Sequence, residues 1–108
     1  MSLGFYTGIL ADQRRIDGVR EGLAQAVHPG DKVLEVGTGL GTFAFLAVQA
    51  GADHVWAVDR DPVIHVAEML AKTSGLHDRI TFLRGEMSEI ALPDQVDLLV
   101  FEDFAVRL

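Results

Sequence analysis

The chain of 108 residues is long enough for one domain with one hydrophobic core. Its 9 Lys and Arg residues against 16 Asp and Glu residues give a formal net charge of −7, which disfavours nonspecific binding to nucleic acid or to an anionic membrane surface. The lack of cysteine excludes disulfides and thiolate metal sites, and without a signal segment or an apolar run of roughly 18 residues the sequence predicts a cytoplasmic protein.

The first 30 residues are predicted to form an N-terminal helical segment. Between Phe5 and Val27 apolar residues recur at the spacing of three to four that is typical of a helix, although glycines interrupt the pattern. We therefore expect one broken helix or two short ones. The turn-forming residues at 28–31 then separate this segment from the rest of the chain.

From residue 31 onward, strand patterns and helix patterns alternate. The β-branched run at residues 33–36 predicts a buried strand, and the apolar stretch at residues 40–50 predicts a buried helix that ends at Gly51. A second strand is expected at residues 54–58. This order is typical of a β-α-β unit with parallel strands.

A second helix follows, with defined ends. Asp61 is the expected N-cap, Pro62 the first helical residue and Gly75 the stop signal. Two further strands are expected at residues 79–83 and 96–101. The order predicts an α/β fold with a Rossmann-like, doubly wound parallel sheet of about four strands, whose ligand crevice lies at the carboxyl ends of the strands.

Three glycines at alternate positions, Gly37, Gly39 and Gly41, connect the first strand to the first helix. Because glycine lacks a Cβ atom, a ligand can approach the backbone there, and the three together indicate a cofactor loop. A P-loop is excluded because the chain contains no Gly-Lys pair. A dinucleotide fingerprint is disfavoured because Thr42 stands where that motif needs glycine or alanine.

Two carboxylates flank this loop in the predicted fold. Glu35 places an anion near the end of the first strand, which is unhelpful to a pyrophosphate but suited to a ligand with an ammonium or sulfonium charge. Asp59 closes the second strand, where a carboxylate can accept hydrogen bonds from both hydroxyls of a ribose. This position indicates an adenosine-type ligand, and by itself it fits NAD and S-adenosylmethionine equally.

Four successive segments resemble the motifs of class I S-adenosylmethionine-dependent methyltransferases: VLEVGTGLG, VWAVDRDP, ITFLRGEMSEIALP and VDLLVFED. Within this superfamily the chain is most similar to the protein arginine methyltransferase family, whose upstream Leu-x-Asp-x-x-Arg element is matched by LADQRR at residues 10–15. The resemblance covers most of residues 9–104 and implies S-adenosylmethionine as the cofactor.

The resemblance also implies roles for individual residues. Arg15 would reach the methionyl carboxylate, while Glu35 and the glycine backbone would hold the amino-acid end and Asp59 the ribose. Glu86 and Met87 would flank the adenine, with Met87 as an apolar, polarizable contact. The predicted cofactor-binding residues are Arg15, Glu35, Gly37, Gly39, Gly41, Asp59, Arg60, Glu86 and Met87, and no metal site is predicted.

The catalytic prediction rests on the end of the chain. Glu102 matches the first glutamate of the two-glutamate clamp that arginine methyltransferases use for a guanidinium, and Glu102 or Asp103 would orient or deprotonate an acceptor nitrogen or oxygen. The superfamily sheet has seven strands and about four are expected here. Residues 31–108 are therefore expected to form an incomplete cofactor-binding domain. This domain would be completed by a second copy in a homodimer or by a missing C-terminal half. Residues 1–30 are expected to cover the cofactor.

The predicted function is the cofactor-binding part of an S-adenosylmethionine-dependent methyltransferase that acts on a nitrogen or oxygen nucleophile. Protein arginine or a small molecule is favoured as acceptor over nucleic acid, and no membrane partner is expected. One alternative is a non-catalytic module that binds S-adenosylmethionine or serves as a scaffold, which the missing acceptor half would explain. A less favoured alternative is an NAD-dependent oxidoreductase, which rests only on the β-α-β order and Asp59.

Overall fold

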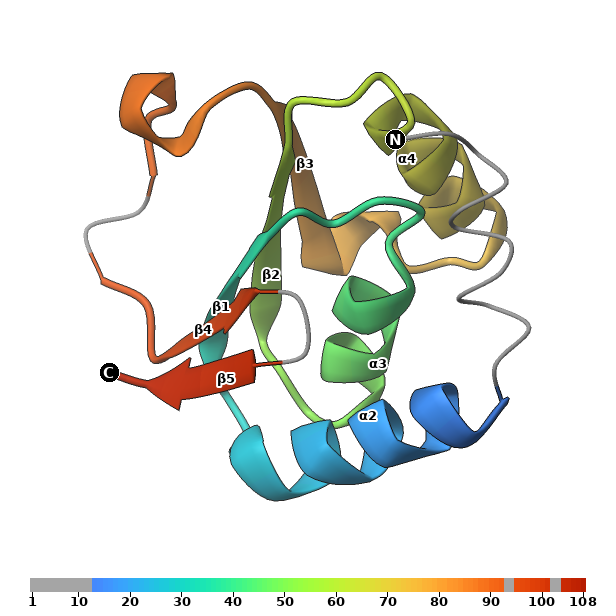
Figure 1. Cartoon of the computed structure of the whole chain (residues 1–108), viewed down its shortest axis with the longest axis vertical. Helices are drawn as coiled ribbons and strands as arrows, with labels where there is room; N and C mark the ends of the chain where they lie inside the picture. The colour runs from blue at the N-terminus through green and yellow to red at the C-terminus, as the bar shows by residue number, and fades with distance from the viewer. Residues whose placement is uncertain (1–12, 93–94, 102–103) are drawn as a thin grey trace.

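The computed structural model describes residues 13–92, 95–101 and 104–108, without the side chains of residues 13–16 and 104. It has the predicted α/β architecture (Figure 1). Its elements are α2 (Gln13–Ala26), β1 (Lys32–Val36), α3 (Thr42–Gln49), β2 (His54–Asp59), α4 (Ile64–Thr73), the 3-10 turn η1 (His77–Arg79), β3 (Ile80–Arg84), the 3-10 turn η2 (Met87–Glu89), β4 (Leu98–Phe101) and β5 (Phe104–Arg107).

The described strands form one sheet in the order β3-β2-β1-β4-β5. The first four strands are parallel, and the register places Val33 of β1 between Val55 of β2 and Leu98 of β4. The last strand, β5, is antiparallel to β4 and pairs Phe101 with Phe104. The sequence pattern predicts about four strands and does not indicate this fifth one, which turns back and pairs with the outer backbone groups of β4.

The described helices α2, α3 and α4 lie on the same side of the sheet (Figure 1). This follows from two right-handed crossovers, β1-α3-β2 and β2-α4-β3, that proceed in the same direction across the sheet. The connection from β3 to β4 carries only η2 among its described residues. A doubly wound sheet has helices on both faces, so the described part of the chain contains one of its two helical layers.

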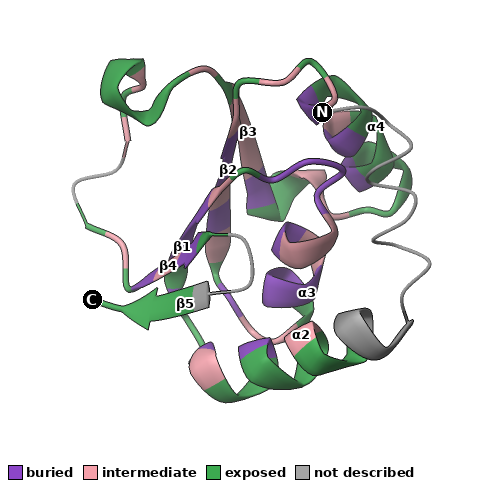
Figure 2. Ribbon diagram, viewed as in Figure 1, coloured by how far each residue is buried: buried purple, intermediate pink, exposed green. Residues whose placement is uncertain are grey.

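The core lies between this sheet face and the helices (Figure 2). Val33, Val55 and Leu98 are 0%, 0% and 1% exposed, α2 adds the buried side chain of Leu23, and Val27 is buried just after the end of this helix. Burying a side chain of this size contributes about 1.5–3 kcal/mol. The apolar face of α2 thus packs on α3 at the amino-terminal edge of the strands and leaves the carboxyl ends to the loops.

The stop of α3 follows its predicted signal, but the start of α4 does not. At the end of α3 the backbone N–H of Gly51 donates to Val48 O at 3.0 Å, and that of Ala52 donates to Ala47 O at 3.1 Å, which is a Schellman motif. At the start of α4 the carboxylate of Asp61 accepts a hydrogen bond of 2.9 Å from an N–H two residues later. The predicted N-cap is therefore wrong: the helix begins at residue 64, its N-cap is Val63 without a side-chain cap, and the Asp61 carboxylate instead stabilises the turn at residues 62 and 63 that precedes the helix.

No described helix combines the length and apolar character needed to cross a membrane.

Candidate cofactor-binding site

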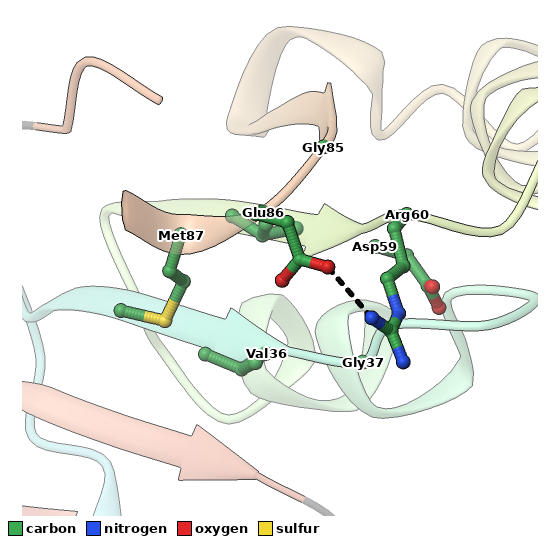
Figure 3. A pocket seen from close by; sticks show the side chains of 8 residues that line it. Val36, Gly37, Asp59, Arg60, Gly85, Glu86 and Met87 are labelled. Carbon is green, nitrogen blue, oxygen red and sulfur yellow. Dashed lines mark hydrogen bonds and ion pairs between the residues drawn. The ribbon is translucent and has the colours of Figure 1, made fainter. Parts of the chain in front are cut away.

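A cavity of about 210 Å³ lies at the carboxyl ends of β1 and β2 (Figure 3). Its lining consists of residues 36–37 at the end of β1, residues 58–60 at the end of β2, and residues 85–87 after β3. The predicted crevice is therefore found where parallel sheets bind ligands. Small-molecule pockets usually have volumes of roughly 300 Å³ or more, so this cavity has room for only part of a nucleoside cofactor.

The glycine loop is tied to the end of β2 by backbone hydrogen bonds. Gly37 N and Thr38 N both donate to Val58 O, at 2.7 and 3.2 Å. Gly39 N donates to Asp59 Oδ2 at 2.8 Å. The loop and the end of β2, although about 20 residues apart in the sequence, thus form a single unit at the edge of the cavity.

Asp59 accepts backbone hydrogen bonds with both of its carboxylate oxygens, one from the glycine loop and one from the turn after β2. Oδ2 accepts from Gly39 N, and Oδ1 accepts from Asp61 N at 2.9 Å. A carboxylate oxygen has two lone pairs, so each oxygen can still accept a hydrogen bond from a ligand hydroxyl. The proposed ribose role of Asp59 stays a prediction, and the structure adds a structural role that the sequence pattern did not indicate.

Glu35 is buried next to the loop, with its side chain only 2% exposed. Its Oε1 and the Thr38 Oγ1 have no hydrogen-bond partner among the described residues. Burial raises the pKa of Glu35 to about 8, and the negative charge of Asp59 acts in the same direction. The nearby Thr38 hydroxyl opposes this shift without making a hydrogen bond of normal geometry. The expected anion is therefore a neutral acid at pH 7 in this structure.

Replacing Glu35 with glutamine is expected to remove a pH dependence of folding stability. The folded chain keeps a proton on Glu35 up to a pKa of about 8, whereas the unfolded chain loses it near the ordinary value of 4.5. Between these values the folded state binds more protons, so the free energy of unfolding falls by about 1.4 kcal/mol per pH unit. Urea unfolding at pH 5, 6.5 and 8 measures this slope.

The matched control for Glu35→Gln is Glu89→Gln, at an exposed glutamate on η2. We expect the control variant to keep the wild-type slope and Glu35→Gln to be more stable than wild type at pH 8. Equal slopes in the wild type and Glu35→Gln would contradict the prediction.

An ion pair joins two of the side chains that line the cavity (Figure 3). Arg60 Nη1 donates to Glu86 Oε1 at 2.6 Å, which joins the end of β2 to the segment after β3. The two side chains are 78% and 52% exposed, so the pair contributes little to stability. The side chain of Met87 projects from the same segment as Glu86, at the other end of the cavity from Arg60 (Figure 3).

The predicted site residues fall into three groups. Those that line the cavity are Gly37, Asp59, Arg60, Glu86 and Met87. A second group, which belongs to β1 or the glycine loop but does not line the cavity, consists of Glu35, Gly39 and Gly41. The predictions that fall outside the described parts of the structure concern Glu102, Asp103 and the side chain of Arg15.

Sequence reasoning did not single out four residues of this region. Val36, Val58 and Gly85 line the cavity, and Thr38 has the buried hydroxyl described above. The first three could have been identified from their positions at or just after the ends of β1, β2 and β3. These strand ends meet in space only because the three strands are neighbours in the sheet. Thr38 lies between two of the loop glycines, and this position was the signal that could have identified it.

No group of acidic, histidine or cysteine side chains within the described residues has an arrangement that could hold a metal ion.

The comparisons with known proteins match the part of the chain that contains the cavity. Residues 33–106 match a methyltransferase domain family. Protein arginine N-methyltransferase 1 of Schizosaccharomyces pombe is 39% identical over 102 residues, which cover 92% of this chain and 30% of that protein. The histone-arginine methyltransferase CARMER of Anopheles gambiae is 41% identical over 76 residues, covering 70% of this chain and 12% of that protein.

Two solved structures share the fold. Arabidopsis thaliana protein arginine methyltransferase 10 superimposes with a TM-score of 0.87 and 33% identity, over 94% of this chain and 30% of that chain. The Trypanosoma brucei PRMT1 enzyme–prozyme heterotetrameric complex with AdoHcy gives a TM-score of 0.86 and 32% identity, over 94% of this chain and 32% of that chain. The chain thus spans about a third or less of the length of these relatives.

Proposed function

Because the chain belongs to the methyltransferase domain family, we propose that it is the cofactor-binding part of an S-adenosylmethionine-dependent methyltransferase. The observation that carries this proposal is the contact between Asp59 and the amide of Gly39 beside a cavity at the strand ends. It brings a ribose-binding type of carboxylate and a glycine loop into one site.

The residues present fit this cofactor. A Cβ atom added at Gly37 would have no heavy atom within 4 Å, so the backbone borders open space where a ligand can lie. Glu35 offers a buried, unpartnered carboxyl oxygen, which suits an ammonium group. Whether neutral or ionised, this carboxyl group carries no positive charge that could pair with a pyrophosphate, so it favours an ammonium group over a dinucleotide.

S-adenosylmethionine supplies a methyl group attached to a sulfonium sulfur when it is bound. In this proposal Asp59 accepts hydrogen bonds from the ribose hydroxyls, Glu35 and the glycine loop hold the amino-acid end, and Met87 contacts the adenine. These residues position the methyl donor in line with the acceptor, which is the main contribution a protein makes to this transfer.

We further propose protein arginine as the methyl acceptor. The support comes from relatives that are named as arginine methyltransferases, including a ribosomal protein arginine N-methyltransferase of S. pombe that is 38% identical over 97 residues. Glu102 and Asp103 would orient the acceptor nitrogen, and Arg15 would contact the cofactor carboxylate. A dimer that completes the acceptor site is part of the proposal, and a cytoplasmic location stays a prediction.

Calorimetric titration of the chain with S-adenosylmethionine, S-adenosylhomocysteine and NAD tests the proposal. We expect the first two ligands to bind and NAD to give no heat of binding. Binding of NAD alone would overturn the assignment in favour of an oxidoreductase. Binding of none of the three would also count against a cofactor site in this chain.

A further inference from the structure

Glu35, two residues before the glycine loop, has a carboxyl oxygen that can still form a hydrogen bond. Its Oε1 is unpartnered among the described residues, and so is the hydroxyl oxygen of Thr38 within the loop. Buried polar atoms are nearly always hydrogen-bonded in proteins. Two such unpartnered atoms beside a loop that borders a cavity indicate polar groups that arrive with the ligand.

The surroundings of Glu35 contain no compensating charge within the described residues. The strands on either side place Ala57 and Val100 opposite it, and α3 carries no titratable side chain. The charge that acts on it from β2 is that of Asp59, which is of the same sign as a glutamate anion. Burial and this neighbour together keep the proton on Glu35, with a pKa of about 8.

A ligand with an ammonium group would reverse this balance. An opposite charge within about 4–6 Å lowers the pKa of a carboxyl group by roughly 1–3 units. The carboxyl group of Glu35 would then ionise to pair with the ammonium, which keeps its own proton. The proton that Glu35 loses passes to the solvent, so the bound complex holds one proton fewer than the separated partners.

We propose that binding of the amino-acid end of the cofactor at this site releases one proton from Glu35, so that the affinity for the cofactor depends on pH. This inference rests on the proposed function. It predicts that affinity rises by up to about tenfold per pH unit while the proton is released. The rise should end near pH 8, above which free Glu35 is already ionised.

The experiment is calorimetric titration of the chain at pH 7 in phosphate and in Tris, two buffers with different enthalpies of ionisation. The difference in apparent heat gives the number of protons released. S-adenosylhomocysteine is expected to release about 0.4–0.9 proton per molecule bound, the range that a lowering of the pKa by roughly 1–3 units gives at pH 7. The matched ligand is 5′-methylthioadenosine, which has the same adenosine but no amino acid and is expected to release none. A Glu35→Gln variant is expected to bind S-adenosylhomocysteine without proton release and with the same affinity at pH 6 and pH 7.

The outcomes separate the inference from its premise. If S-adenosylhomocysteine binds without releasing a proton, the inference is overturned and the proposed function stands. Equal proton release with 5′-methylthioadenosine, or in the Glu35→Gln variant, would also overturn it, because the proton would then come from another group. Failure of S-adenosylhomocysteine to bind wild type would overturn the proposed function itself. If the variant does not fold, the comparison of the two ligands on wild type decides the question.

Discussion

Replacing Asp59 with alanine is expected to weaken binding of S-adenosylhomocysteine by about 100-fold or more. A hydrogen bond to a charged group contributes about 1.5–3 kcal/mol, and a ribose would make two of them to this carboxylate. Since 1.4 kcal/mol corresponds to a factor of ten in affinity, the loss of both exceeds two orders of magnitude. Calorimetric titration at pH 7.5 measures the effect.

The variant also loses the two backbone contacts that Asp59 makes to Gly39 and Asp61. Its folding should therefore be checked by urea unfolding. Asp59→Asn separates the two contributions, because it keeps one acceptor oxygen but places an amide group against a backbone N–H. The control is Asp53→Asn, at an exposed aspartate just before the opposite end of β2, which should bind like wild type. An Asp59→Ala variant that folds and binds with wild-type affinity would remove the ribose role.

Gly41→Ala is expected to lower the free energy of unfolding by about 2–5 kcal/mol. Gly41 has φ +87° at the N-cap of α3, where a residue with a Cβ atom is strained by about 1–2 kcal/mol. The added Cβ would lie 3.1 Å from Phe45 Cζ and 3.2 Å from Ala67 Cβ of α4, and overpacking of this kind costs roughly 1–3 kcal/mol. Urea unfolding with an unchanged m-value measures the loss.

Gly37→Ala is the matched comparison. Gly37 has a similar φ of +79°, but a Cβ atom there would have no heavy atom within 4 Å. We expect it to show only the conformational cost of about 1–2 kcal/mol. It should also weaken S-adenosylhomocysteine binding, because the methyl group would occupy open space beside the cavity that the ligand needs. Equal destabilisation by the two variants would show that contact with Phe45 and α4 is not what requires glycine at position 41.

The candidate site was predictable to the extent that its residues lie at ends of elements. The positions of Gly37, Asp59 and Met87 follow from where strands stop and turns begin, and parallel strands bring their carboxyl ends to one edge. The Arg60–Glu86 ion pair was not predictable, because it joins residues 26 positions apart. The pairing of β5 with β4 was also missed, since its apolar residues at 104–106 read equally well as a loop after the fourth strand.

The sequence by itself determined the order of the first strands and helices, the glycine loop and the glycine stops after α3 and α4, because these depend on the preferences of neighbouring residues. The motif resemblance led to the methyltransferase family in the same way, without any distance being known. Only the tertiary structure decided the protonation of Glu35 and the second role of Asp59. A pKa depends on burial by several elements and on a charge from another strand, and the hydrogen bond from Gly39 to Asp59 exists only because β1 and β2 are neighbours in the sheet.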